Sequence, residues 1–167
     1  VDEFEWIDSS IFLFDITSAL ASGTVTDGEV RLDILTNYSD ATMADWSIDL
    51  ISSNPTSNTD LVDADYDIGD FGTTAYDSVL DTESTGYNTF RLGETGVTYV
   101  NEGGNIAKFG ARMNWDTAET FEGEWVATTR VGRQYSSADT AGDPSTDYAP
   151  RLSLTIEANT SYLAMIL

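Results

Sequence analysis

The stretch that decides the fold is Ser10–Ile16, which reads SIFLFDI. In an extended chain successive side chains point to opposite faces, so Phe12, Phe14 and Ile16 would share one face and Asp15 would lie on the other. Apolar residues at every second position are typical of a β-strand that is buried on one side. The stretch therefore predicts a strand that needs a second layer to cover its aromatic face.

The same alternation recurs along the chain. Glycine, Asp-Gly, Asn-Pro and Gly-Asp-Pro sequences, which are typical of turns, stand between the alternating segments. No window of comparable length has the spacing of an amphipathic helix. Short strands joined by turns indicate an all-β sandwich or barrel. The further expected strands lie in residues 29–35, 45–51, 88–92, 108–115, 124–135 and 151–158.

These segments predict an all-β fold, a single antiparallel β-sandwich of jelly-roll type. The length of 167 residues suits one domain, and no internal repeat or linker divides the chain. We expect an N-terminal arm over residues 1–8, the jelly roll over residues 9–158, and an apolar C-terminal strand or docking tail over residues 159–167.

The chain is very acidic, with 29 Asp and Glu against 7 Lys and Arg and a formal net charge of −22. A surface this negative repels phosphate backbones and anionic lipids, which argues against nucleic acid and membrane surfaces as partners. No stretch reaches the roughly 20 apolar residues that span a bilayer, so we expect no membrane insertion. Such acidity is compatible both with a saline environment and with ordinary solubility.

Histidine and cysteine are both absent from the sequence. Their absence excludes Ser-His-Asp and Cys-His nucleophile systems as well as histidine and thiolate metal sites. Paired carboxylates alone can hydrolyse a glycoside, and Glu122 and Glu124 next to Trp125 form the most enzyme-like arrangement. With 29 acids, however, nearly every segment contains such a pair. We therefore expect no enzymatic activity.

Residues 61–72, LVDADYDIGDFG, hold acids that could bind a metal ion or shape a turn. Calcium takes several hard oxygen ligands, which alternating aspartates in a loop can supply. The spacing is not that of an EF-hand, because Thr74 stands where the closing glutamate would be. The alternatives are another kind of calcium site and a solvated acidic turn in which Tyr66, Ile68 and Phe71 pack inward. The candidate calcium ligands are Asp63, Asp65, Asp67 and Asp70.

Four tryptophans and eight tyrosines make carbohydrate binding another candidate function. Trp115, Trp125 and Tyr135 lie in or beside expected loops, where exposed rings would serve as stacking platforms for sugars. The alternative is that the aromatic residues pack inside the sandwich, as we expect for Trp46. The arginines are expected to be structural, with Arg112 paired to a nearby carboxylate.

The C-terminal residues 161–167, SYLAMIL, form an uninterrupted apolar run after the last expected strand. Such a run on so acidic a protein is not expected to remain exposed to water. It is either a final core strand of the same domain or an anchor that docks on a neighbouring subunit. The candidate assembly residues are Tyr162, Leu163, Met165, Ile166 and Leu167.

Several quoted segments follow one another in a distinctive order. They are SSIFLFDIT (9–17), TVTDGEVRLDIL (24–35), ADWSIDLI (44–51), DADYDIGDFGTTAYDS (63–78), TGYNTFRLGETGVTYV (85–100), GGNIAKFGARMNWD (103–116) and YAPRLSLTIEA (148–158). This order resembles the DNRLRE-type family of jelly-roll modules, which occur in extracellular and cell-surface proteins and, as close variants, in phage and archaeal-virus particles. The resemblance implies a β-sandwich with a non-catalytic, binding or architectural role.

Together these features predict a structural protein of a virus particle, a capsid decoration, head-fibre or tail-associated jelly roll that acts through protein–protein assembly. The expected partners are further copies of the chain and other virion proteins, and no cofactor is expected apart from the candidate calcium ion. The alternative is an extracellular carbohydrate-binding or adhesion module that binds surface glycans, supported by calcium. The expected location is accordingly the virion or the extracellular space.

Overall fold

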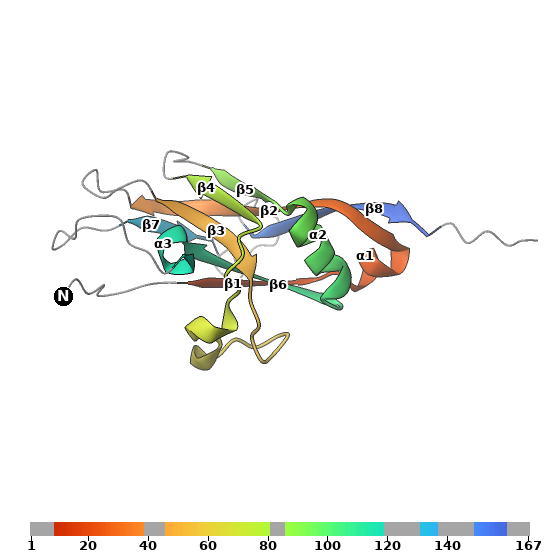
Figure 1. Ribbon diagram of the computed structural model, residues 1–167, viewed down its shortest axis with the longest axis horizontal. Helices are drawn as coiled ribbons and strands as arrows, with labels where there is room; N and C mark the ends of the chain where they lie inside the picture. The colour runs from red at the N-terminus through yellow and green to blue at the C-terminus, as the bar shows by residue number, and fades with distance from the viewer. Residues whose placement is uncertain (1–8, 39–45, 81–85, 119–130, 137–148, 160–167) are drawn as a thin grey trace, which may run out of the picture.

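A computed structural model of the chain describes residues 9–38, 46–80, 86–118, 131–136 and 149–159. Most of these residues lie in strands, which form two antiparallel sheets that pack face to face (Figure 1). The all-β sandwich that the alternating segments predict is confirmed, while its jelly-roll connectivity stays a prediction. The first sheet has the order β1-β6-β3-β4, with β1 Ser10–Asp15, β6 Ile106–Met113, β3 Ser47–Ser52 and β4 Asp77–Leu80.

The second sheet is built around β2, which runs from Gly23 to Tyr38. On one side β2 pairs with β5, and on the other it pairs first with β8 and then, further along, with β7. Its partners span β5 Tyr87–Arg91, β7 Gly132–Tyr135 and β8 Arg151–Ala158. The β8 bounds match the predicted strand at residues 151–158.

A bulge in β2 keeps its apolar side chains on the inner face. Val25, Val30 and Leu32 are all buried, although Val25 and Val30 are separated by an odd number of positions. The pairing of β2 with β8 shifts register between Val25 and Asp27, so one extra residue restores the alternation. A single continuous strand can therefore present one apolar face to the other sheet along its length.

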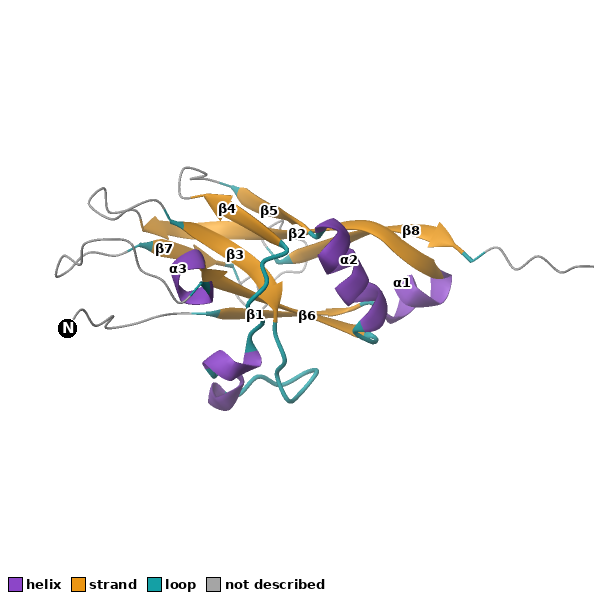
Figure 2. Ribbon diagram, in the orientation of Figure 1, coloured by secondary structure: helices purple, strands orange, loops and turns teal. Residues whose placement is uncertain are grey.

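The main helix, α2 Gly93–Glu102, corrects the expectation that the chain has no helical segment (Figure 2). Glycine, threonine and valine give this stretch low helix propensity, so its sequence alone does not indicate a helix. Tertiary contacts stabilise it instead. Val100 is fully buried, and the Asn101 amide donates to the Val25 carbonyl at 2.9 Å and accepts from the Val25 N–H at 3.0 Å.

Two shorter helices complete the frame. They are α1 Thr17–Ser22, between β1 and β2, and α3 Asn114–Thr117, directly after β6. Two 3-10 turns, Asp63–Tyr66 and Ile68–Asp70, lie in the connection between β3 and β4.

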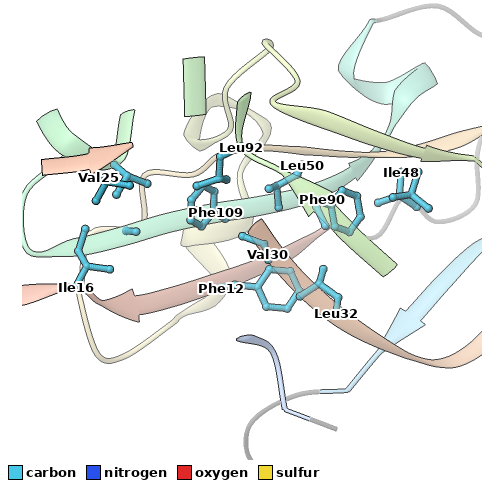
Figure 3. Packing of buried hydrophobic residues seen from close by; sticks show 14 of the residues in the cluster. Phe12, Ile16, Val25, Val30, Leu32, Ile48, Leu50, Phe90, Leu92 and Phe109 are labelled. Carbon is cyan, nitrogen blue, oxygen red and sulfur yellow. The ribbon is translucent and has the colours of Figure 1, made fainter. Parts of the chain in front are cut away.

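The core between the sheets is aromatic and aliphatic (Figure 3). Phe109 of β6 lies at its centre, and its ring makes edge contacts with Phe14, Tyr76 and Tyr99 at centroid distances of 5.6–6.2 Å. The expected inner face of β1 is confirmed, since Phe12 and Ile16 are buried and Phe14 packs against the same cluster.

Some polar residues that alternation assigns to the solvent side are buried. Ser47 and Asp49 of β3 and Asp33 of β2 are each less than 8% exposed. Asp49 accepts a hydrogen bond from the Ser78 hydroxyl at 2.6 Å, and Asp33 accepts one from the Ser136 hydroxyl at 3.3 Å. The outer faces are therefore partly covered, which a period-two pattern cannot reveal.

A polar network ties the two sheets together inside the sandwich. Asn88 of β5, which is 2% exposed, accepts hydrogen bonds from Arg133 at 2.8 Å and from the Tyr135 hydroxyl at 3.1 Å. Arg133 also donates to the Leu80 carbonyl at 2.7 Å, and its guanidinium lies 5.4 Å from the centre of the Trp46 ring. One acceptor oxygen thus serves two donors from β7.

Replacing Asn88 tests this network. Asn88→Leu removes the acceptor from two buried donors, and we expect the free energy of unfolding to fall by about 2–3 kcal/mol. Asn88→Asp keeps an acceptor oxygen beside the Arg133 guanidinium and should remain within about 1 kcal/mol of the wild type. Urea denaturation measures both values; equal losses in the two variants would show that hydrogen bonding to Asn88 does not matter.

Candidate functional site

The most distinctive surface is a projecting loop, residues 53–72, which stands out from the outer face of the first sheet (Figure 1). Its two ends are held together where it leaves β3. The Gly72 N–H donates to the Ser52 carbonyl at 3.0 Å, and the Asn54 N–H donates to the Asp70 carbonyl at 2.7 Å. The loop is therefore closed at its base by backbone hydrogen bonds.

Phe71 fastens the loop to the sheet. Its side chain packs with Ile11 and Ile51 in a second, smaller core on the outer face. A Cβ atom at Gly110 would lie 2.6 Å from the Phe71 ring, so only glycine at that position allows this approach. The Arg112 guanidinium lies 5.4 Å from the centre of the same ring.

Two charged groups hold the inner side of the loop. The single lysine, Lys108 of β6, donates to the Pro55 carbonyl at 2.9 Å. Asp65 is 2% exposed, and its two carboxylate oxygens accept from the Val62 and Thr56 N–H groups, each at 2.9 Å. The hydrogen bond from Val62, then that from Thr56, and in smaller measure the charge of Lys108, lower the pKa of Asp65 below 3.8.

The four candidate calcium ligands have different surroundings. Asp63 and Asp67 are exposed, Asp70 is half-buried and Asp65 points inward. Asp67 accepts from the Gly69 N–H at 3.4 Å, and both oxygens of Asp65 are engaged by the backbone. Within the part of the chain that the structure describes, no three Asp, Glu, His or Cys side chains come together as a metal site. Calcium binding stays a prediction.

The alternative of a turn with three inward-packed apolar residues is correct for Phe71 and wrong for the other two. Tyr66 is 44% exposed and Ile68 is 60% exposed, because the two 3-10 turns direct them away from the sheet. Leu61 and Val62 are exposed beside them. The loop thus presents an apolar surface among acids, and no lysine or arginine occurs in residues 53–72.

The expected aromatic platform is not formed by Trp115. This residue is 7% exposed and belongs to the main core, so the expectation that it lies at the surface is wrong. The turn of α3 brings it inward, where the neighbouring Asn114 side chain accepts from the Ser47 N–H at 3.0 Å. Tyr135 is half-buried, and Trp46 is buried as expected.

A second charged cluster lies on the outer face of the first sheet. Arg112 is 3% exposed and forms an ion pair with Asp116 at 2.6 Å, which confirms its expected structural pairing. Burial raises the pKa of the nearby Asp49 carboxyl above 3.8, against the effect of hydrogen bonds from Ser78, Thr117 and Ser47. The Asp49 side chain is enclosed, since the residue is only 6% exposed.

Several predicted site residues lie outside the described residues. They are Trp125, Glu122 and Glu124, and the assembly residues Tyr162, Leu163, Met165, Ile166 and Leu167. Among the described helices none is long and apolar enough to cross a membrane.

Comparison of the chain with protein-family models, curated proteins and solved structures gave no match. The resemblance to DNRLRE-type modules therefore stays a prediction. What the chain does has to be argued from its own surface.

Truncating Phe71 should release the loop. We expect Phe71→Ala to lower the free energy of unfolding by about 3 kcal/mol and to speed thermolysin cleavage within residues 53–72. Ile68→Ala, at an exposed position of the same loop, should change stability by less than about 0.5 kcal/mol. Thermal denaturation and timed proteolysis provide both readouts, and an unchanged cleavage rate in Phe71→Ala would contradict the anchoring role.

The two buried aspartates should respond to pH in opposite ways. The folded-state pKa of Asp49 is raised, so its contribution to stability falls as pH rises from 3.8 through that value. Asp49→Asn should therefore stabilise the protein near pH 7, with the gain vanishing below pH 3.8. The folded-state pKa of Asp65 is lowered, so its contribution is present above pH 3.8 and is lost as pH falls through the folded value.

Asp65→Asn should accordingly destabilise the protein near pH 7, and its difference from the wild type should shrink as the pH is lowered. Urea denaturation of both variants across this pH range is the measurement. Parallel pH profiles for the two variants would contradict the opposite pKa shifts.

Proposed function

We propose that this protein is a non-catalytic structural module of a virus particle, a capsid decoration, head-fibre or tail-associated module that acts through protein–protein assembly. The observation that carries the proposal is the projecting loop. Phe71 and Lys108 fasten the loop to the sheet, and Asp65 braces it internally. Val62 and Ile68 of the loop are 57% and 60% exposed. The loop combines firm attachment with an apolar contact surface.

This combination suits binding to another protein. Apolar side chains that stay in water cost free energy, and a patch of them rimmed by polar groups marks an interaction site. A loop that is already ordered loses little conformational entropy when it binds. The energetic gain on burying Val62 and Ile68 is therefore available for association.

Two sequence features support the assembly role. The resemblance to DNRLRE-type jelly rolls implies an architectural role, and the apolar run at residues 161–167 suits docking on a neighbour. The glycan-binding alternative has less support, because the two described tryptophans, Trp46 and Trp115, are buried and offer no stacking face. We therefore put forward no second function.

Light scattering on the eluate of a size-exclusion column tests assembly. We expect the intact chain to form oligomers and Val62→Asp/Ile68→Asp to shift them toward monomer, with an unchanged melting temperature. Leu35→Asp/Leu80→Asp is the matched control, because those side chains are 48% and 57% exposed and lie on strands away from the loop. A chain ending at Thr160 separates the effect of the apolar tail from that of the loop.

An intact chain that is monomeric at every concentration would sink the assembly proposal. The virion part is tested separately by mass spectrometry of particles purified from the source of the sequence. Structural amounts of the chain in the particles are expected, and its absence from them would overturn the virion assignment.

A further inference from the structure

Three asparagines in the sequence are followed, two positions later, by serine or threonine. They are Asn37 in NYS, Asn54 in NPT and Asn159 in NTS. Asn-X-Ser/Thr is the acceptor sequence for N-linked glycosylation when X is not proline. Pro55 therefore excludes Asn54, although that residue is exposed. Two acceptor sequences remain, and the structure distinguishes them.

Asn37 lies inside a paired strand. It belongs to β2 and stands opposite Arg133 of β7 in the register of the two strands. The residue is half-buried, and its side-chain oxygen is enclosed without a hydrogen-bond partner among the described residues. A glycan is bulky and needs a surface position. Attaching one at Asn37 would push β2 away from its neighbours, so the fold disfavours this acceptor.

Asn159 comes directly after β8 and is exposed. Its backbone N–H donates a long hydrogen bond, at 3.5 Å, to the carbonyl of Ser22 at the end of α1. β8 ends at the same end of the sandwich as α1 and α2 (Figure 1). The fold thus places the main chain at this position and leaves the residue open to solvent, as an acceptor asparagine requires.

Space for a sugar lies beside Asn159. The residue borders an open hollow of about 510 Å³ between α1, α2 and the start of β2. Thr24, Thr98 and Glu102 also line this hollow, and all three are exposed. Their hydroxyl and carboxylate oxygens can form hydrogen bonds with the hydroxyl groups of a sugar. A first sugar on Asn159 would therefore meet polar groups and open space.

We propose that Asn159 is a site of N-linked glycosylation and that Asn37 is not used. The attached group is an oligosaccharide, which a cellular transferase takes from a lipid-phosphate carrier. A bond forms between Asn159 Nδ2 and the anomeric carbon of the first sugar, and the bond from that carbon to the carrier phosphate breaks. The phosphate keeps the electron pair, and Nδ2 loses one proton.

This modification is independent of the assembly function proposed above. N-linked glycans occur on secreted and surface proteins, which agrees with the expected virion or extracellular location. One residue separates Asn159 from the apolar run at residues 161–167. A chain ending at Thr160 lacks Ser161, so it loses the acceptor sequence together with the run. Ser161→Ala in the intact chain removes the acceptor sequence alone.

Peptide mass spectrometry of the chain purified from its source tests the proposal. Trypsin cleaves after arginine, so Asn37 and Asn159 fall in different peptides, residues 32–91 and the peptide that begins at Leu152. We expect the peptide from Leu152 to carry a glycan mass that fragmentation locates on Asn159. The peptide of residues 32–91 should carry no glycan on Asn37.

Variants secreted by a eukaryotic cell line provide the matched controls. Asn159→Gln removes the acceptor and Ser161→Ala removes the required hydroxyl, so each should abolish the glycan mass. Ser161→Thr preserves the acceptor sequence and should retain it. Ser39→Ala breaks the acceptor sequence at Asn37 and should leave the glycan mass unchanged. Circular dichroism confirms that each variant is folded.

A glycan on Asn159 of the native chain, with loss of the glycan mass in Asn159→Gln and in Ser161→Ala, supports the proposal. An unmodified peptide from Leu152 in the native chain overturns it. A glycan on Asn37 in place of Asn159, or a glycan mass that survives Ser161→Ala, also overturns it. The oligomeric state is measured separately, so these outcomes leave the assembly function unaffected.

Discussion

The packing of Phe71 over Gly110 is the contact on which the functional surface depends. Because glycine has no side chain, the Phe71 ring can lie directly on β6 and complete a small core with Ile11 and Ile51. That core secures one end of a loop whose other side is held by Lys108. Without it, the loop would be attached only by the Lys108 contact and by the backbone hydrogen bonds at its base.

Period-two alternation was sufficient to predict the sheets because burial on one face repeats at every second residue. It could not predict which outer faces would be covered. Asp49 and Asp33 have the positions of exposed residues but are buried by segments distant in the chain. The sequence does not indicate the α2 helix for a related reason: Val100 and Asn101 stabilise it through contacts with the core and with β2, and its own helix propensity is low.

The acidic stretch shows the same limit within the candidate site. The sequence identified the loop as unusual, but four aspartates at close spacing do not reveal that Asp65 is an internal acceptor while Asp63 remains in water. Nor could spacing show that Tyr66 and Ile68 point outward. A turn directly after a strand favours a surface position for Trp115, but this turn folds back into the core.

The few cations of this chain are divided between the interior of the fold and the outer face of the second sheet. In a chain with 29 acids and 7 cations, each arginine has many local acids to pair with. Arg112 and Arg133 are used inside the fold, whereas Arg31 and Arg151 are set opposite each other on an outer face.

The most direct measurement is hydrogen exchange at the Thr56 and Val62 amides of the intact protein, because both donate to Asp65 inside the projecting loop. We expect protection well above that of an unstructured chain, since both amides donate to the carboxylate of Asp65, which is buried within the loop. Exchange of both amides at the rate of an unstructured peptide would mean that the loop is not held on the sandwich, and would contradict the account of its contact surface.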